Sequence, residues 1–113
     1  MKRMFLILTL ALVATTLLNG CLMRQLSAGH YNEYNNRGLA LLSRHDYESA
    51  KRRFLRAYDE AEAGFLGPRA KAAALYNYSL AAGHCGDYAE AEKAMKDAMK
   101  LDALASHKGA KAV

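Results

Sequence analysis

A short motif occurs twice in this chain, and it constrains the fold more than any other feature. The sequence DYESA at residues 46–50 is closely matched by DYAEA at residues 87–91. Each copy continues with a large apolar residue and then a further alanine at the same spacings, namely Phe54 and Ala57 in one and Met95 and Ala98 in the other. Repetition of this kind predicts a repeated supersecondary structure.

Apolar and small residues recur every three or four positions around both copies, which is the spacing of an amphipathic helix. Examples are Tyr47, Ala50, Phe54, Ala57, Tyr88, Ala91, Met95 and Leu101. Turn residues divide the region at residues 44–46, 64–68 and 84–87. Among them Pro68 suits a first helical turn, Gly86 a helix stop and Asp87 a cap. The sequence therefore predicts an all-α fold of four helices between about residues 31 and 105.

The two helix–turn–helix units resemble the tetratricopeptide repeat (TPR), a family whose unit has 34 residues. The second copy is the closer match, with Leu75-Tyr76-Asn77 in its first helix and Gly86-Asp87-Tyr88 at its turn. The resemblance implies two TPR-like repeats that form a four-helix fragment of an α-solenoid. The copies depart from the family pattern at Arg37, His45, Ser79 and Ala103, and their motifs lie 41 residues apart. Small residues at Gly38, Ser79, Ala50 and Ala91 are expected to let the helix axes approach to roughly 8–10 Å.

The first twenty residues have a different character. Lys2 and Arg3 precede an apolar run from Phe5 to Leu18, and Asn19 and Gly20 lead into Cys21. A charged start, a short apolar run and small residues before a cleavage point are typical of a secretory signal peptide. The run has about fourteen residues, fewer than the roughly twenty that span a bilayer as a helix. An uncleaved membrane anchor is the alternative.

Residues 18–21, Leu-Asn-Gly-Cys, resemble the bacterial lipobox. The resemblance implies cleavage before Cys21 and a covalent lipid on its thiol. The chain then divides into a signal peptide at 1–20, a lipidated tether at 21–30, the TPR-like domain at 31–105 and a polar C-terminal tail at 106–113. Several acyl chains together anchor a protein firmly. By the rule of that family, Leu22 in place of Asp favours the outer membrane, on its periplasmic side.

The sequence offers no catalytic constellation, and we expect neither an enzyme nor a cofactor beyond the lipid on Cys21. Removal of Lys2 and Arg3 lowers the net charge from +5 to about +3, which is no nucleic-acid signature. His84, Cys85 and Asp87 could share a metal ion, but roles in a turn and a helix cap explain them better, so no metal site is expected. With Cys21 lipidated, Cys85 is either a buried thiol, the reading we prefer, or available for an intermolecular bond.

The TPR resemblance also implies a partner-binding groove along the inner face of the first helix of each repeat. The matching positions are Asn32, Asn35, Asn36, Leu39, Tyr76, Asn77, Leu80 and His84. Asn36 and Asn77 occupy the same repeat position, where an amide can both donate to and accept from a bound backbone. Tyr76 would supply a rigid aromatic anchor. Plain surface asparagine is the alternative for both amides.

Together these features predict a membrane-tethered, non-catalytic adaptor whose groove binds another envelope protein, for example in assembly of a pilus, secretion or envelope complex. Two repeats are fewer than the three or so that usually make a stable array. We therefore expect marginal stability, a dimer, or a partner that covers the exposed end. The alternative function is a self-associating structural envelope lipoprotein with no peptide ligand.

Overall fold

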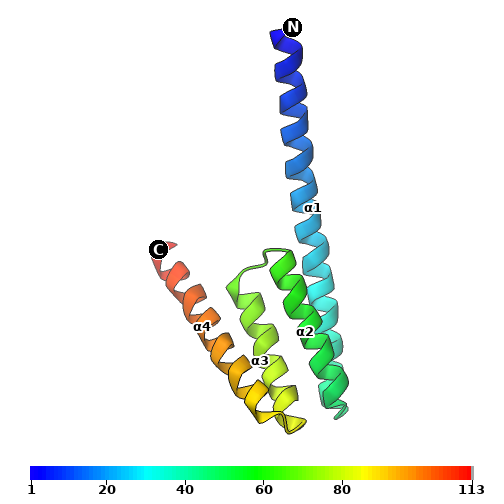
Figure 1. Cartoon of the computed structure of the whole chain (residues 1–113), viewed down its shortest axis with the longest axis vertical. Helices are drawn as coiled ribbons and strands as arrows, with labels where there is room; N and C mark the ends of the chain where they lie inside the picture. The colour runs from blue at the N-terminus through cyan, green and yellow to red at the C-terminus, as the bar shows by residue number, and fades with distance from the viewer. Residues whose placement is uncertain (113) are drawn as a thin grey trace.

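The computed structural model describes the backbone of residues 1–112 and the side chains of residues 1–107. Four helices, joined by three short turns, make up this part of the chain (Figure 1). They are α1 (Lys2–Ser43), α2 (Tyr47–Ala63), α3 (Pro68–His84) and α4 (Tyr88–Ala112). Residues 1–112 contain no strand, which confirms the predicted all-α class and its four helices.

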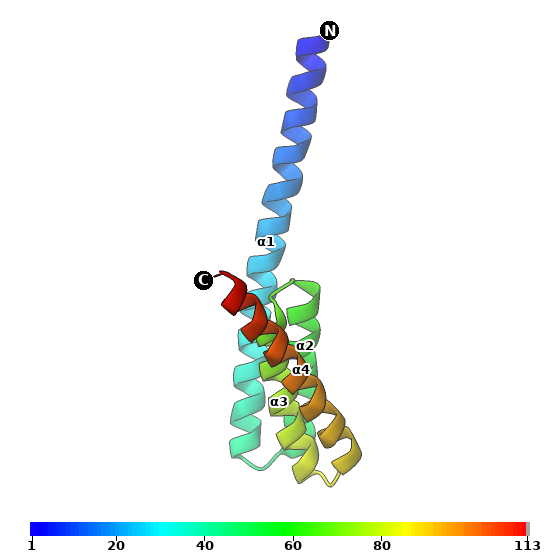
Figure 2. The same cartoon turned by 90° about the vertical axis from the view of Figure 1, so that its left-hand side faces the viewer.

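The helices pack in the order in which they follow one another along the chain. α1 packs on α2, α2 on α3, and α3 on α4, while α1 also makes a small contact with α3. Within the described residues α4 contacts no helix other than α3. Two perpendicular views show α4 crossing α3 on the side away from α1 (Figures 1 and 2). The last helix of the stack is therefore covered on one side only.

Small side chains and one phenylalanine build the core. Ala50, Ala57 and Ala81 are fully buried, and Phe54 is the largest side chain that solvent does not reach. A Cβ atom added at Gly38 would lie 2.5 Å from Cε1 of Phe54, so the ring fills the space that the glycine leaves. The expectation of small residues where α1 meets α2 is thus confirmed at this contact.

The turns follow the predicted punctuation. The Asp46 carboxylate accepts a 3.3 Å hydrogen bond from the Ser49 backbone N–H and so caps α2, while Pro68 stands in the first turn of α3. Gly86 has a φ of 84° and His45, its counterpart in the first copy, a φ of 65°. The two turns thus share a left-handed residue, although only one of them has the glycine that favours it.

Residues 21–30, where we expected a tether, belong to α1 and continue it without a break. The chain has no proline in this stretch to interrupt the hydrogen-bonding ladder. Ser27 is buried against Gly64, and the Tyr31 hydroxyl donates a 2.9 Å hydrogen bond to the Ala70 carbonyl of α3. The tether region is therefore helical, and its second half packs on the domain.

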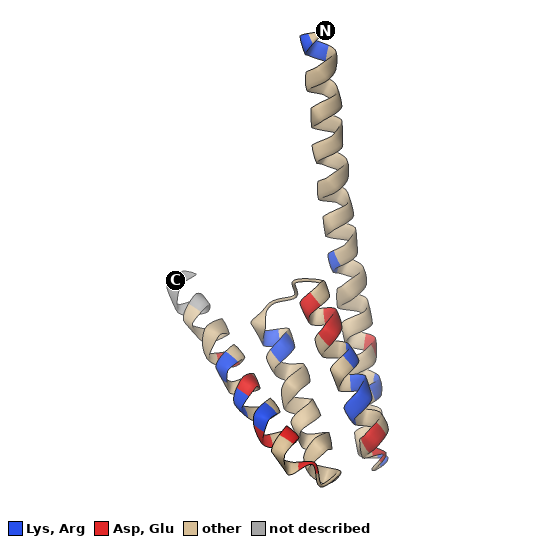
Figure 3. Cartoon of the chain, viewed as in Figure 1, with Lys and Arg blue, Asp and Glu red and all other residues tan. Residues whose placement is uncertain are grey.

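The N-terminal half of α1 extends away from the other helices (Figure 1). No residue from 1 to 26 is buried, and Figure 3 shows no charged residue between its tip and the region of Arg24. Its most apolar 18-residue window has a mean hydropathy of 2.1, so by length and composition the helix could cross a membrane. A signal sequence has the same properties.

Candidate functional site

An open, mostly apolar groove runs between α3 and α4, with a volume of about 590 Å³. Its lining residues are Arg69, Ala72, Ala73, Tyr76, Met95, Ala98, Met99 and Asp102. Ala72 and Ala98 are buried and form the floor, whereas Tyr76 is 49% exposed and Met99 66% exposed. The groove thus combines an aromatic ring with flexible thioether side chains, which adapt to irregular apolar partners.

In the first repeat a further helix covers the surface that corresponds to this groove. In that repeat α3 packs on the α1–α2 pair: its Ala81 belongs to the same buried cluster as Phe54, and its Tyr78 packs against this cluster. Phe54 is fully buried, yet its repeat counterpart Met95 is only half-buried. Tyr58 is likewise half-buried, whereas its counterpart Met99 is exposed. The α3/α4 groove is therefore where a fifth helix would pack if the stack continued.

Two residues of the groove predicted from the sequence connect α1 to α3. Asn77 Nδ2 donates a 3.0 Å hydrogen bond to Asn35 Oδ1, and both side chains are partly buried. This bond ties the two helices together and uses one amide donor of Asn77 that we had assigned to a ligand. Asn32 and Asn36 are exposed on α1. Leu39 and Leu80 are exposed as well.

The remaining two predicted groove residues lie elsewhere. Tyr76 lines the α3/α4 groove. The His84 ring stacks on Tyr47 of α2 with centroids 4.4 Å apart and planes 9° from parallel. The Tyr47 hydroxyl in turn lies 2.7 Å from Nδ1 of His45. His84 therefore belongs to an aromatic cluster at the end of the bundle that holds the α1–α2 and α3–α4 turns.

Sequence reasoning identified Tyr76 but missed Met95 and Met99 as site residues. Comparing the two repeats position by position could have found Met99. It replaces the aromatic Tyr58 at the equivalent position of the repeat.

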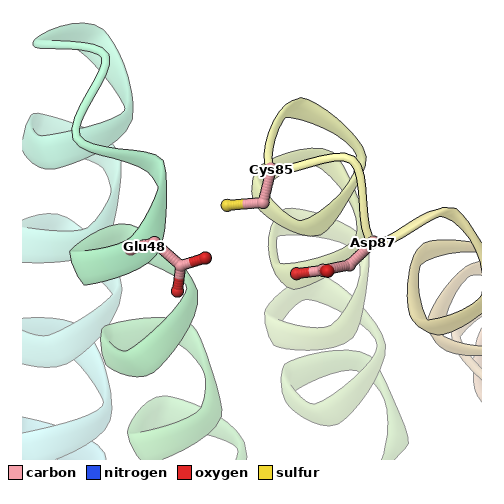
Figure 4. A group of neighbouring side chains, drawn as sticks. All are labelled: Glu48, Cys85 and Asp87. Atoms are coloured by element: carbon pink, nitrogen blue, oxygen red, sulfur yellow. The ribbon is translucent and has the colours of Figure 1, made fainter.

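Glu48, Cys85 and Asp87 form a second cluster, between the start of α2 and the α3–α4 turn (Figure 4). One potential ligand atom from each lies within 4.8 Å of the others. The Lys51 ammonium already pairs with both carboxylates of this cluster. Its Nζ donates to Asp87 Oδ2 at 2.7 Å and lies 3.6 Å from Glu48 Oε2. The trio His84, Cys85 and Asp87, which the sequence offered as possible metal ligands, does not come together, because the His84 ring packs on Tyr47.

The protonation of this cluster fits an ion pair better than a metal centre. Desolvation by burial, followed by the hydrogen bond to Glu48, raises the pKa of the Cys85 thiol above its usual value. A thiolate is the form that binds metal or attacks an electrophile, so the raised pKa opposes both roles. The hydrogen bond to Asp87 raises the pKa of Lys51, which keeps its ammonium charged.

Tyr78 links α3 to α4 beside the same cluster. Its hydroxyl donates a 2.8 Å hydrogen bond to Glu90 Oε2. Burial, followed by this bond, raises the pKa of Tyr78 to about 12. The phenol therefore stays protonated at neutral pH and acts as a structural donor.

Cys21, the predicted lipidation site, is exposed on the projecting part of α1. A thiol in this position is accessible to a modifying enzyme.

A scan against known protein families, a search of curated proteins and a search of solved structures each found no match. The class that the fold itself defines is a small all-α protein of four sequentially packed helices, the first of which begins with an exposed apolar segment.

Proposed function

We propose that this protein is a membrane-tethered, non-catalytic adaptor built from two TPR-like repeats, and that its α3/α4 groove binds an amphipathic helix of another envelope protein. The observation that carries the proposal is the contrast between the two repeats. The apolar surface that α3 covers on the first helix pair is left open on the second, at Tyr76, Met95 and Met99.

A helix is the ligand that this groove suits. The groove lies between two antiparallel helices, and α3 fills the corresponding position one step earlier in the stack. Helix-in-groove recognition places apolar anchors at spacings of three and four residues in such a channel. Arg69 and Asp102 line the groove as well and would pair with charges flanking those anchors.

The tether is the second part of the proposal. The exposed apolar half of α1 and the lipobox-like residues 18–21 support cleavage before Cys21 and lipidation of its thiol. Leu22 after that cysteine favours the outer membrane, facing the periplasm. The groove would then be held at the membrane, where an envelope partner could reach it.

Capture of partners from native envelopes by the full-length protein, with three single variants, tests the groove. Met99→Lys places an ammonium in the apolar channel and should weaken retention of a specific partner at least about tenfold, because burying the ammonium under a bound helix removes its hydration. Leu55→Lys is the matched control, since Leu55 is also exposed but lines neither groove. It should retain the partner.

Leu39→Lys separates the two candidate surfaces. Loss of the partner with Leu39→Lys, but not with Met99→Lys, would move binding to the α1/α3 face predicted from Asn36 and Asn77. Recovery of the bait alone, with a mass that rises with concentration and falls in Met99→Lys, would instead support the self-associating alternative.

A further inference from the structure

The turn between α2 and α3 lies at the end of the domain from which the apolar part of α1 projects (Figures 1 and 2). Gly64, the first residue of this turn, packs so closely on Ser27 that a Cβ atom would overlap the serine side chain. Ser27 follows Cys21 by six residues and Arg24 by three, which correspond to about 9 Å and 4.5 Å along a helix. The turn therefore lies within about 10 Å of the point where α1 becomes continuously apolar.

The next residue of the turn is Phe65. Neither packing nor backbone geometry explains why a phenylalanine stands at this position. The residue is 86% exposed, the highest value among the large apolar residues of the domain. Its φ is 50°, in the left-handed region that glycine and asparagine adopt readily and a bulky residue does not. Backbone hydrogen bonds hold the turn, with the Leu66 N–H bonded to the Ala61 carbonyl at 2.9 Å. Strained backbone positions of this kind cluster at functional sites.

Further apolar residues lie beside the turn. Phe65, Pro68, Leu101 and Leu104 line one hollow of about 470 Å³ between the turn and α4, and Leu104 is 54% exposed. The same hollow includes one acidic residue, Glu62, and one basic residue, Lys71. These two charges balance, so the hollow itself offers a mainly apolar contact.

We propose that Phe65, with Leu104 beside it, inserts into the lipid surface that α1 enters and forms a second membrane contact that orients the domain. A lipid surface is the occupant that the geometry favours, because α1 itself leads from this end of the domain into its apolar segment. Aromatic and leucine side chains bury readily 5–10 Å into the boundary between head groups and acyl chains. This inference rests on the tether of the proposed function, but it holds for a lipidated Cys21 and for an uncleaved α1 alike.

The chain contains no tryptophan, so single tryptophans can report depth in the membrane. The full-length protein is reconstituted in vesicles of phosphatidylethanolamine and phosphatidylglycerol whose acyl chains carry bromine, which quenches indole fluorescence on contact. Phe65→Trp tests the turn. Met23→Trp, on the exposed part of α1, tests the tether, and Tyr88→Trp, exposed at the opposite end of the domain, is the solvent control.

Strong quenching and blue-shifted emission at positions 23 and 65, with neither at 88, is the expected result, and salt should not weaken it. Quenching at 23 with solvent-like emission at 65 would overturn the second contact while leaving the tether intact. Absence of quenching at 23 would refute the tether and, with it, this inference.

A second variant tests the premise that the ring has no role in folding. Phe65→Asn keeps a residue that tolerates the left-handed backbone. Its thermal midpoint in detergent should equal or exceed that of the parent. A clearly lower midpoint would show that the ring supports the fold, and the case for a membrane role would fail.

Discussion

The contact between Gly38 and Phe54 shows how a single methyl group can matter in this domain. The ring of Phe54 is fully buried and occupies the space where a side chain at position 38 would begin. The sequence marked Gly38 as a small residue in the repeat, but the atom that it makes room for came from the structure. Close packing of this kind leaves little freedom for the neighbour to move away.

Gly38→Ala should therefore destabilise the protein although alanine is the better helix former. We expect a loss of about 1–3 kcal/mol in the free energy of unfolding, measured with urea in detergent, because the added Cβ displaces a packed ring. Gly83→Ala is the matched control. Its Cβ would meet nothing closer than Ala91 Cβ at 4.0 Å, so it should be neutral or stabilising by up to about 1 kcal/mol. Equal effects at the two positions would contradict this account of the core.

At the scale of elements, α1 differs most from the sequence-based expectation. Residues 21–30 show no sustained apolar period, and a short lipidated tether was expected there. In the structure they continue the helix, and Ser27 and Tyr31 join it to the α2–α3 region. Such contacts at the edge of a packed domain are the kind that open locally without global unfolding.

Gly64→Ala tests this attachment. The added methyl group would overlap Ser27 and should push α1 away from the end of α2. We expect trypsin to cut the detergent-solubilised variant after Arg24 several-fold faster than it cuts the parent. Gly29→Ala, on the same helix with nothing within 4 Å of its Cβ, should be cut at the parental rate. An unchanged rate in Gly64→Ala would show that this contact does not hold the helix.

At the scale of the whole molecule, the two repeats are unequal because, among residues 1–112, a further helix packs on the first pair alone. Ala50 lies at the centre of the first helix pair and is fully buried beside Ala81 of α3, whereas its counterpart Ala91 is half-buried. The sequence alone treats these positions as equivalent and predicts overpacking at both. The structure predicts a difference between them, because within residues 1–112 no further helix packs on the second pair.

Ala50→Phe should accordingly cost more than Ala91→Phe. Overpacking a closed core typically costs 1–3 kcal/mol or more, and we expect about that loss for Ala50→Phe. Ala91→Phe should lose clearly less, because its ring can turn toward the uncovered side. Urea unfolding of the two full-length variants at low protein concentration measures both. A larger loss at Ala91 would mean that the second pair is the more tightly closed.

The sequence by itself determined the all-α class, the turns near His45, Gly64 and Gly86, and the apolar character of the first twenty residues. Each of these depends on neighbours along the chain: helical periodicity, a capping carboxylate, or an uninterrupted apolar run. For the same reason the candidate site could be predicted only as far as Tyr76, a residue that the repeat pattern itself marks.

Only the tertiary structure decided which side chains meet across helices. The bond from Asn77 to Asn35, the stacking of His84 on Tyr47 and the exposure of Met99 depend on the register and crossing of separate helices. A shift of one residue turns a helical side chain by about 100°, so residues with the same repeat position, such as Asn36 and Asn77, can have different neighbours. The open α3/α4 groove likewise arises from the order in which the helices pack.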